Sequence, residues 1–276
     1  MKAIEVCPST LMPGYAGYSP RAVKVLFDGV AVSPFLDVDF EKVQDQRQAM
    51  ENMKNISISG AQEKFGLCFS SSGQPVFITK RFDVNGGVKD CSQEDFAAIL
   101  QMTEEGNDSN FKYHGNYVQI ADAIRKIIPA WMPQMEQFFR MVVFNYLFAN
   151  EDAHMKNFSL VNRNGEYFLA PAYDLINTCA HIQSGSDMGL LGGLSPDIEK
   201  SDVYDRTGHP CRLDFERFAE RIELPKKRAE MTLNMFMKIP QETYGLIDRS
   251  FLNDKMKRTY KRVIEERRVR FIRESE

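Results

Sequence analysis

The sequence predicts an α+β fold with two lobes, a small strand-rich lobe over residues 1–83 and a larger helical lobe over residues 84–276. Short apolar runs bounded by turn residues occur up to about residue 82, which is typical of strands. From residue 92 onward the apolar residues recur at helical spacing. Acidic, amide and basic residues gather within the helical lobe at residues 150–174, and these supply the candidate chemistry.

The small lobe begins with an irregular segment, because prolines and glycines punctuate residues 1–55. One short apolar helix or strand is expected near residues 23–27. Strands are expected at residues 56–60, 64–69 and 76–82, with a turn at residues 70–75.

Helices dominate the second lobe. Ser92 with Asp95 is typical of a helix N-cap, which predicts a helix from there to about residue 102. A polar loop is expected at residues 105–116. Further helices are expected at residues 117–128, at residues 133–149 and over most of the chain after residue 213.

The composition is that of a soluble protein, with 43% hydrophobic and 26% charged residues. No apolar run approaches the ~18 residues that a membrane-spanning helix needs, so no membrane contact is expected. The five cysteines are scattered and form no C-x-x-C pair, which favours reduced thiols and a cytoplasmic location.

The net charge of −3 gives no bulk reason to expect nucleic-acid binding. Residues 253–273 nevertheless carry nine lysines and arginines. Either this helix contacts DNA or an acidic partner, or it exposes a solvated basic face while its apolar residues pack inward. The apolar residues in question are Phe251, Tyr260, Val263, Ile264 and Phe271.

The most informative stretch is residues 150–158, followed by Asp174. Asp152 and Asn157 have the D-x-x-x-x-N spacing of a kinase catalytic loop. A hairpin is expected between Asn157 and Asp174, with strands at residues 158–161 and 166–170. Its two ends would lie together, so Asn157 and Asp174 could hold one Mg²⁺ while Asp152 orients a hydroxyl nucleophile. The alternative is a charged helix end followed by an ordinary hairpin.

Five segments in this order resemble the HipA-like serine/threonine kinases, which are the toxins of bacterial toxin–antitoxin modules. The likeness is closer to the short HipT-type members. The matching segments are residues 57–64 (SISGAQEK), 76–83, 93–95, 150–158 and 173–175. The resemblance implies a two-lobed protein-kinase-like fold.

The resemblance also implies roles for individual residues. Those that would bind ATP are Gly60, Ala61, Gln62, Glu63 and Lys64 in the Gly-rich loop, Lys80 and Phe82 in the hinge, Asp83 at the ribose, and His154 and Lys156 near the phosphates. Asp152 would be catalytic, Asn157 and Asp174 would bind Mg²⁺, and Ser57 and Ser59 would be autophosphorylated. Plainer alternatives are a strand-ending turn for the loop, an exposed strand end for the hinge, a buried hydrogen-bonded histidine for His154, and solvated hydroxyls for the serines.

As a family expectation, the chain transfers the γ-phosphate of ATP to a protein serine, for which an aminoacyl-tRNA synthetase is the expected substrate. A HipB-like DNA-binding antitoxin and a small HipS-like protein are the expected partners. Two other classes remain open: a kinase-shaped binding protein without turnover, and a small-molecule phosphotransferase.

The sequence departs from the family between the Gly-rich loop and the hinge. Kinases need a phosphate-binding lysine on the next strand and a helix with its acidic partner. Only residues 66–75 are available here, whereas a strand and a helix together need about 25 residues or more. Either the small lobe is truncated or an internal segment is absent from this sequence. Lys80 could stand in for the lysine, but the following Arg-Phe-Asp fits the hinge better. With this sequence alone, the chain is expected to bind ATP weakly.

Overall fold

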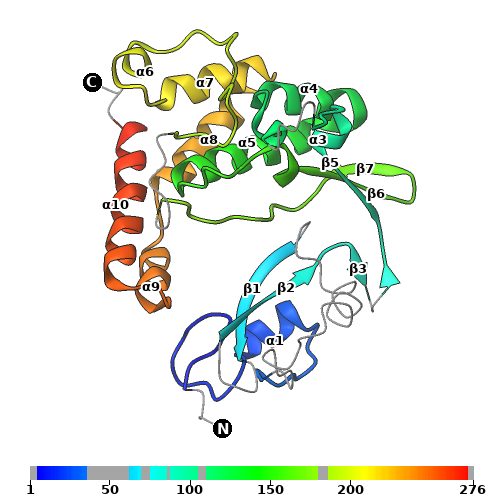
Figure 1. Cartoon of the computed structure of the whole chain (residues 1–276), viewed down its shortest axis with the longest axis vertical. Coiled ribbons are helices and arrows are strands. Elements are labelled where there is room, and N and C mark those ends of the chain that lie inside the picture. Colours follow the sequence, from blue (N-terminus) through cyan, green and yellow to red (C-terminus); the bar gives the residue numbers. More distant parts are fainter. Residues whose placement is uncertain are drawn as a thin grey trace.

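The computed structural model describes residues 5–35, 62–69, 75–85, 88–104, 110–179 and 186–272. Figure 1 shows a helical body and, on one side of it, a smaller part that carries α1 (Pro20–Leu26), β1 (Gln62–Phe69) and β2 (Pro75–Arg81). The α+β class predicted from the sequence is confirmed.

Strands β1 and β2 form an antiparallel pair, with Glu63 opposite Lys80 and Lys64 opposite Thr79. The strands expected at residues 64–69 and 76–82 are thus confirmed, and the one expected at residues 56–60 lies outside the described residues. Residues 70–74 alone connect β1 to β2. Five residues are too few for a further strand and helix between β1 and β2.

The apolar element expected near residues 23–27 is the helix α1. The Ser19 side chain caps it by accepting a hydrogen bond from the Ala22 amide, and Pro20 occupies its first turn, where no amide donor is needed. Ala22 and Leu26 pack on the buried Cys7, which gives this part a small core of its own.

The chain enters the helical body through β3 (Val84–Asn85), β4 (Val88–Lys89), β5 (Ser92–Asp95) and the short helix α3 (Phe96–Ile99). The helix predicted from Ser92 to about residue 102 is confirmed only at residues 96–99, and its predicted start was wrong, because residues 92–95 pair with a strand more than sixty residues later in the chain. Asp95 does act as an N-cap, but for α3, by accepting from the Ala98 amide.

The helices expected in the middle of the chain are confirmed as α4 (Tyr117–Ile127) and α5 (Trp131–Leu147). A capping box formed by Asn116 and Gln119 begins α4. Helix α4 packs on α5. The aromatic rings of Tyr117, Phe138 and Phe158 contact one another there, with centroid distances of 5.6–6.4 Å. These contacts place the main core directly beneath the segment that follows α5.

That segment contains a short 3₁₀ turn, η2 (Met155–Asn157), and the predicted hairpin of β6 (Ser159–Arg163) and β7 (Glu166–Leu169). Asn164 and Gly165 form its two-residue turn, with φ of 54° and 89°. Positive φ at both turn positions suits the twist of a hairpin, and Asn-Gly adopts it at low cost. The sheet order is β5-β6-β7.

The rest of the body is helical, as expected: α6 (Asp202–Thr207), α7 (Arg212–Arg221), α8 (Lys226–Met237), α9 (Gln241–Arg249) and α10 (Asp254–Arg270). Ile264 and Phe271 pack inward from α10 as predicted, but Phe251 is 59% exposed and does not. None of the described helices is long and apolar enough to cross a membrane.

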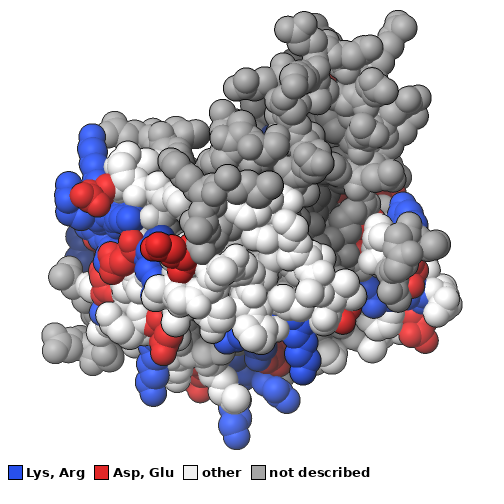
Figure 2. Space-filling view, turned by 90° about the horizontal axis from the view of Figure 1, so that it is seen from below, with Lys and Arg blue, Asp and Glu red and all other residues white. Residues whose placement is uncertain are grey.

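Basic side chains of α10 have acidic neighbours. Lys261 pairs with Asp248, Arg262 with Glu266 and Arg268 with Glu265. Figure 2 likewise shows lysine and arginine side chains beside aspartate and glutamate on the face in view. This mixture of signs is the pattern of a solvated surface.

Candidate active site

The candidate catalytic loop follows the end of α5, and hydrogen bonds of the Asn150 side chain hold it in place. The Asn150 amide nitrogen Nδ2 donates to Asn145 Oδ1 and to the carbonyl of Asp174, both at 3.0 Å. Its Oδ1 accepts from the Asp152 backbone amide at 3.3 Å. One buried side chain thus joins the end of α5, the catalytic loop and the segment after the hairpin.

Asp152, the predicted catalytic residue, is held at both its side chain and its backbone. The Tyr113 hydroxyl donates to Asp152 Oδ1 at 2.5 Å, and the Asn157 Nδ2 donates to the Asp152 carbonyl at 2.7 Å. The carboxylate remains 33% exposed, so a substrate hydroxyl can approach it. Burial, and then the adjacent Asp152 carboxylate, raise the pKa of Tyr113 to about 12, which keeps its hydroxyl a donor.

Asn157 and Asp174, the predicted metal ligands, lie on the two segments that flank the hairpin. Asn157 is 6% exposed and uses its amide nitrogen on the Asp152 carbonyl, which leaves its amide oxygen as the atom that would bind a cation. Asp174 is half-buried and has a φ of 54°. Oxygen donors of these two kinds fit Mg²⁺. In the described part of the chain no three His, Cys, Asp or Glu side chains converge, so such a site would depend on the asparagine.

Tyr173 connects the segment after the hairpin to the catalytic loop. Its hydroxyl donates to the Lys156 carbonyl at 2.8 Å and is also bonded to Ser159 Oγ, which accepts from Gln93 Nε2 at 3.0 Å. Burial raises the pKa of Tyr173 well above its usual range, so it stays neutral. This contact positions residue 174 beside the loop, as the hairpin argument requires.

His154 is buried, at 6% exposed, and its ring packs edge-on against Tyr113 at 5.1 Å. Burial, and then the charge of Lys112, lower the pKa of His154. Its Nε2 lies 3.9 Å from Asp152 Oδ1, and its Nδ1 has no hydrogen-bond partner within the described residues. A neutral histidine here would contribute shape and polarity to the loop rather than positive charge.

Two lysines border the loop instead. Lys156 is exposed, with Nζ 5.9 Å from the Phe111 ring centroid, and Lys112 lies with Nζ 5.0 Å from the Tyr113 ring centroid. Phe111, Lys112 and Tyr113 form the 3₁₀ turn η1 (Phe111–Tyr113). Lys156 remains the predicted phosphate neighbour that is placed to meet an anion from solvent.

The predicted hinge lies next to the hairpin. Phe82 packs against the cluster that contains Tyr173, and its carbonyl accepts from Arg163 Nη2 at 3.2 Å. Asp83 is 2% exposed, and its carbonyl accepts from the Asp90 amide at 2.8 Å. The predicted hinge and the hairpin are therefore in contact, although the roles of these residues toward adenine, ribose and a metal stay predictions.

Other predicted residues belong to the small lobe. Gln62, Glu63 and Lys64 open β1, and Lys80 lies near the end of β2, opposite Glu63. Ser57, Ser59, Gly60 and Ala61 lie outside the described residues. Their proposed contacts with ATP stay predictions as well.

Sequence reasoning missed Tyr113 and the anchoring role of Asn150. Tyr113 stands in an unremarkable polar segment 39 residues before Asp152. No spacing rule connects the two, and only the fold brings them together. Asn150 is the first residue of the motif, but its contact with Asp174 spans 24 residues and depends on the hairpin.

Comparisons with known proteins identify the family of this chain. Residues 63–243 match the family described as the HipA-like C-terminal domain. A Sinorhizobium fredii protein named "Putative kinase Y4mE" is 25% identical over 140 residues, which are 49% of this chain and 33% of that protein. A Haemophilus influenzae protein named "Putative kinase" is 29% identical over 106 residues, which are 37% of this chain and 30% of that protein. The chain thus spans about a third of the length of these curated relatives.

A solved structure shares the fold. It is the complex of HipA, HipB and operator DNA from the Shewanella oneidensis MR-1 toxin–antitoxin system, matched with a TM-score of 0.55 and 15% identity. The match covers 81% of this chain and 54% of the Shewanella chain. The resemblance drawn from the motifs is confirmed, since the family match covers well over half of the 276 residues: the chain belongs to the HipA-like C-terminal domain family.

Proposed function

We propose that the chain carries the catalytic half of an ATP-dependent serine/threonine protein kinase of HipA type. The observation that supports this most is the placement of Asp152, whose carboxylate is bonded to Tyr113 and whose carbonyl is bonded to Asn157. Phosphoryl transfer uses an oriented carboxylate together with an amide and a second carboxylate, which Asn157 and Asp174 would supply here.

In the proposed reaction Asp152 accepts the proton of the substrate hydroxyl. The hydroxyl oxygen forms a bond to the γ-phosphorus of ATP, the bond from that phosphorus to the bridging oxygen breaks, and ADP leaves. Asn157 and Asp174 would hold Mg²⁺, which offsets the phosphate charge. Lys156 is exposed on the same loop and would meet the phosphates from the solvent side.

The short β1–β2 connection favours a second candidate function. Because it has no room for a phosphate-binding lysine strand and helix, a kinase-shaped binding protein with little turnover is the alternative. Such a protein would keep the base and metal residues but hold ATP weakly. The two candidates differ in one measurable quantity, the rate of transfer by this chain.

We base further proposals, on the substrate, the autophosphorylation sites and the partners, on the resemblance to the HipA-like kinases. The substrate would be a protein serine, as in an aminoacyl-tRNA synthetase, and Ser57 and Ser59 would be autophosphorylation sites. The Shewanella HipA structure is a complex with HipB and operator DNA, and we propose a HipB-like antitoxin as partner, and a small HipS-like protein as a further one. A cytoplasmic location suits these partners.

The test is a radiolabelled-ATP assay with a protein substrate, on the parent chain and the Asp152→Asn variant. Asn keeps an oxygen that can accept from Tyr113, so the fold should persist while the base is lost. Asp197→Asn, at an exposed loop position, is the matched control. Transfer by the parent and the control but not by Asp152→Asn supports the kinase. Transfer by all three refutes the assignment of Asp152, and transfer by none, with weak ATP binding, favours the alternative.

A further inference from the structure

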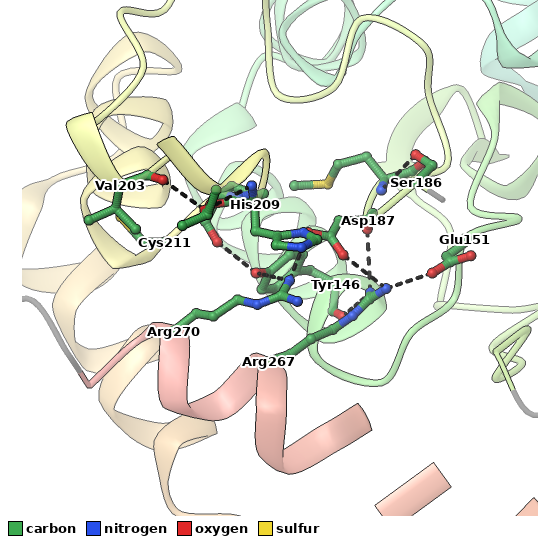
Figure 3. Close-up of polar contacts among 12 residues, drawn as sticks. Tyr146, Glu151, Ser186, Asp187, Val203, His209, Cys211, Arg267 and Arg270 are labelled. Atoms are coloured by element: carbon green, nitrogen blue, oxygen red, sulfur yellow. Dashed lines mark hydrogen bonds and ion pairs between the residues drawn. The ribbon is translucent and has the colours of Figure 1, made fainter. Parts of the chain in front are cut away.

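Two arginines near the end of α10 point into the helical body, as Figure 3 shows, although this helix is otherwise basic and solvated. The Arg267 side chain is 3% exposed. Its Nη2 donates to Glu151 Oε1 at 2.6 Å, its Nη1 donates to the Tyr146 carbonyl at 2.6 Å, and its guanidinium lies over the Tyr146 ring at 5.3 Å. Arg267 therefore joins α10 to α5 and to the residue before Asp152.

Asp187 completes the cluster from a different segment. Its Oδ1 lies 3.3 Å from Arg267 Nη2, and its Oδ2 accepts from Arg270 Nη1 at 2.7 Å. The same Oδ2 lies 2.7 Å from His209 Nδ1. Two buried carboxylates thus meet two arginines, and Arg267 touches both acids.

Both acids lie close to Asp152: Glu151 is its neighbour in the chain, and Asp187 belongs to a segment that packs on the catalytic loop. Glu151 is its immediate neighbour, and its backbone amide donates to Thr178 Oγ1 at 3.1 Å. Asp187 is two residues before Gly189, where a Cβ atom would lie 2.6 Å from backbone atoms of Ala153. The segment that carries Asp187 therefore packs closely on the catalytic loop at Ala153, the residue that follows Asp152.

A buried ion pair is a costly way to stabilise a fold, since desolvation offsets much of its attraction. It does hold its members in one geometry, because any unpaired charge left inside is strongly unfavourable. Here that geometry includes the backbone at residues 151 and 153, between which Asp152 stands. Proton transfer needs such precision, since a misplacement of about 1 Å can cost roughly a hundredfold in rate.

We propose that Arg267 is a positioning residue for the catalytic loop, acting through Glu151 on one side of Asp152 and through Asp187 on the other. The rate of phosphoryl transfer would then depend on how α10 packs against α5 and the catalytic loop. The inference rests on the proposed phosphoryl transfer for its effect on rate. Its structural part, that Arg267 orders residues 150–157, does not depend on any activity.

The test uses the full chain with Arg267→Met, Arg267→Lys and Glu151→Gln. Arg262→Met is the matched control, because Arg262 lies on the same helix in an exposed pair with Glu266. Hydrogen exchange is measured at residues 150–157 and, as an internal reference, within α5. Steady-state kcat and the KM for ATP are measured in the same samples.

Arg267→Met should raise exchange at residues 150–157 while leaving α5 unchanged, and should lower kcat by about tenfold or more with KM for ATP changed by less than about threefold. Arg267→Lys keeps the charge, so its exchange at residues 150–157 and its kcat should lie between those of Arg267→Met and the parent. If Arg267→Met fails to fold, Arg267→Lys and Glu151→Gln decide the matter by the same readouts.

Unchanged exchange and unchanged kcat in folded Arg267 variants would overturn the proposal. A uniform rise in exchange that includes α5 would also overturn it, since Arg267 would then be merely structural. If the parent transfers no phosphate, the proposed function fails, and the exchange arm alone decides whether Arg267 orders the loop.

Discussion

Replacing Tyr113 with phenylalanine removes one atom, the hydroxyl that donates to Asp152 Oδ1 at 2.5 Å. A hydrogen bond to a charged group contributes about 1.5–3 kcal/mol. Because the Asp152 side chain is 33% exposed, water can replace part of this bond, and the lower end, about 1.5 kcal/mol, is the better figure. Its loss frees the carboxylate to rotate away from the acceptor hydroxyl.

The expected result is a fall in kcat of about tenfold relative to the parent chain, since about 1.4 kcal/mol corresponds to a factor of ten. The KM for ATP should change little, because the Tyr113 hydroxyl donates to the predicted base Asp152 and not to a group assigned to ATP. The assay is steady-state transfer to a protein substrate at saturating Mg²⁺. Tyr167→Phe on β7, where the side chain is 42% exposed, is the control.

Two results would refute this reasoning. A kcat equal to that of the Tyr167→Phe control would mean that the bond does not orient the carboxylate. A kcat above that of the parent would mean that the Tyr113 hydroxyl competes with the acceptor for Asp152. Melting curves of both variants ensure that the comparison is made between folded proteins.

Three further outcomes are expected. Asp174→Ala should weaken Mg²⁺-dependent nucleotide binding more than Asn157→Ala does, because a carboxylate attracts the cation as a full charge and an amide only as a dipole; equal affinities by calorimetry would contradict this. Burial lowers the pKa of His154 below 6.5, so the unfolded chain binds this proton more readily and stability should fall as the pH drops below about 6.5. His154→Gln should remove that part of the pH dependence of stability, as measured by urea unfolding. An unchanged pH dependence would show that His154 does not cause it. The parent chain should bind ATP at least about tenfold more weakly than a kinase with the phosphate lysine, and ordinary kinase affinity would contradict the placement of Lys80 in the hinge.

Local patterns in the sequence determined a large part of this protein. Asn164 and Gly165 placed the hairpin turn, because only certain residues accept positive φ at low cost. The apolar periodicity located α4 and α5, and the spacing of Asp152 and Asn157 indicated the candidate catalytic loop before any fold was known. Each of these signals lies within a few residues along the chain.

The tertiary structure alone decided what depends on distant partners. Residues 92–95 become a strand because their backbone pairs with β6 in an antiparallel sheet, and this pairing outweighs their helix-capping pattern. Tyr113 reaches Asp152, and Arg267 turns inward to Glu151, across 39 and 116 residues. A charged or polar side chain takes the position where its buried partners satisfy it, and those partners are set by the packing of all the helices together, which no local spacing contains.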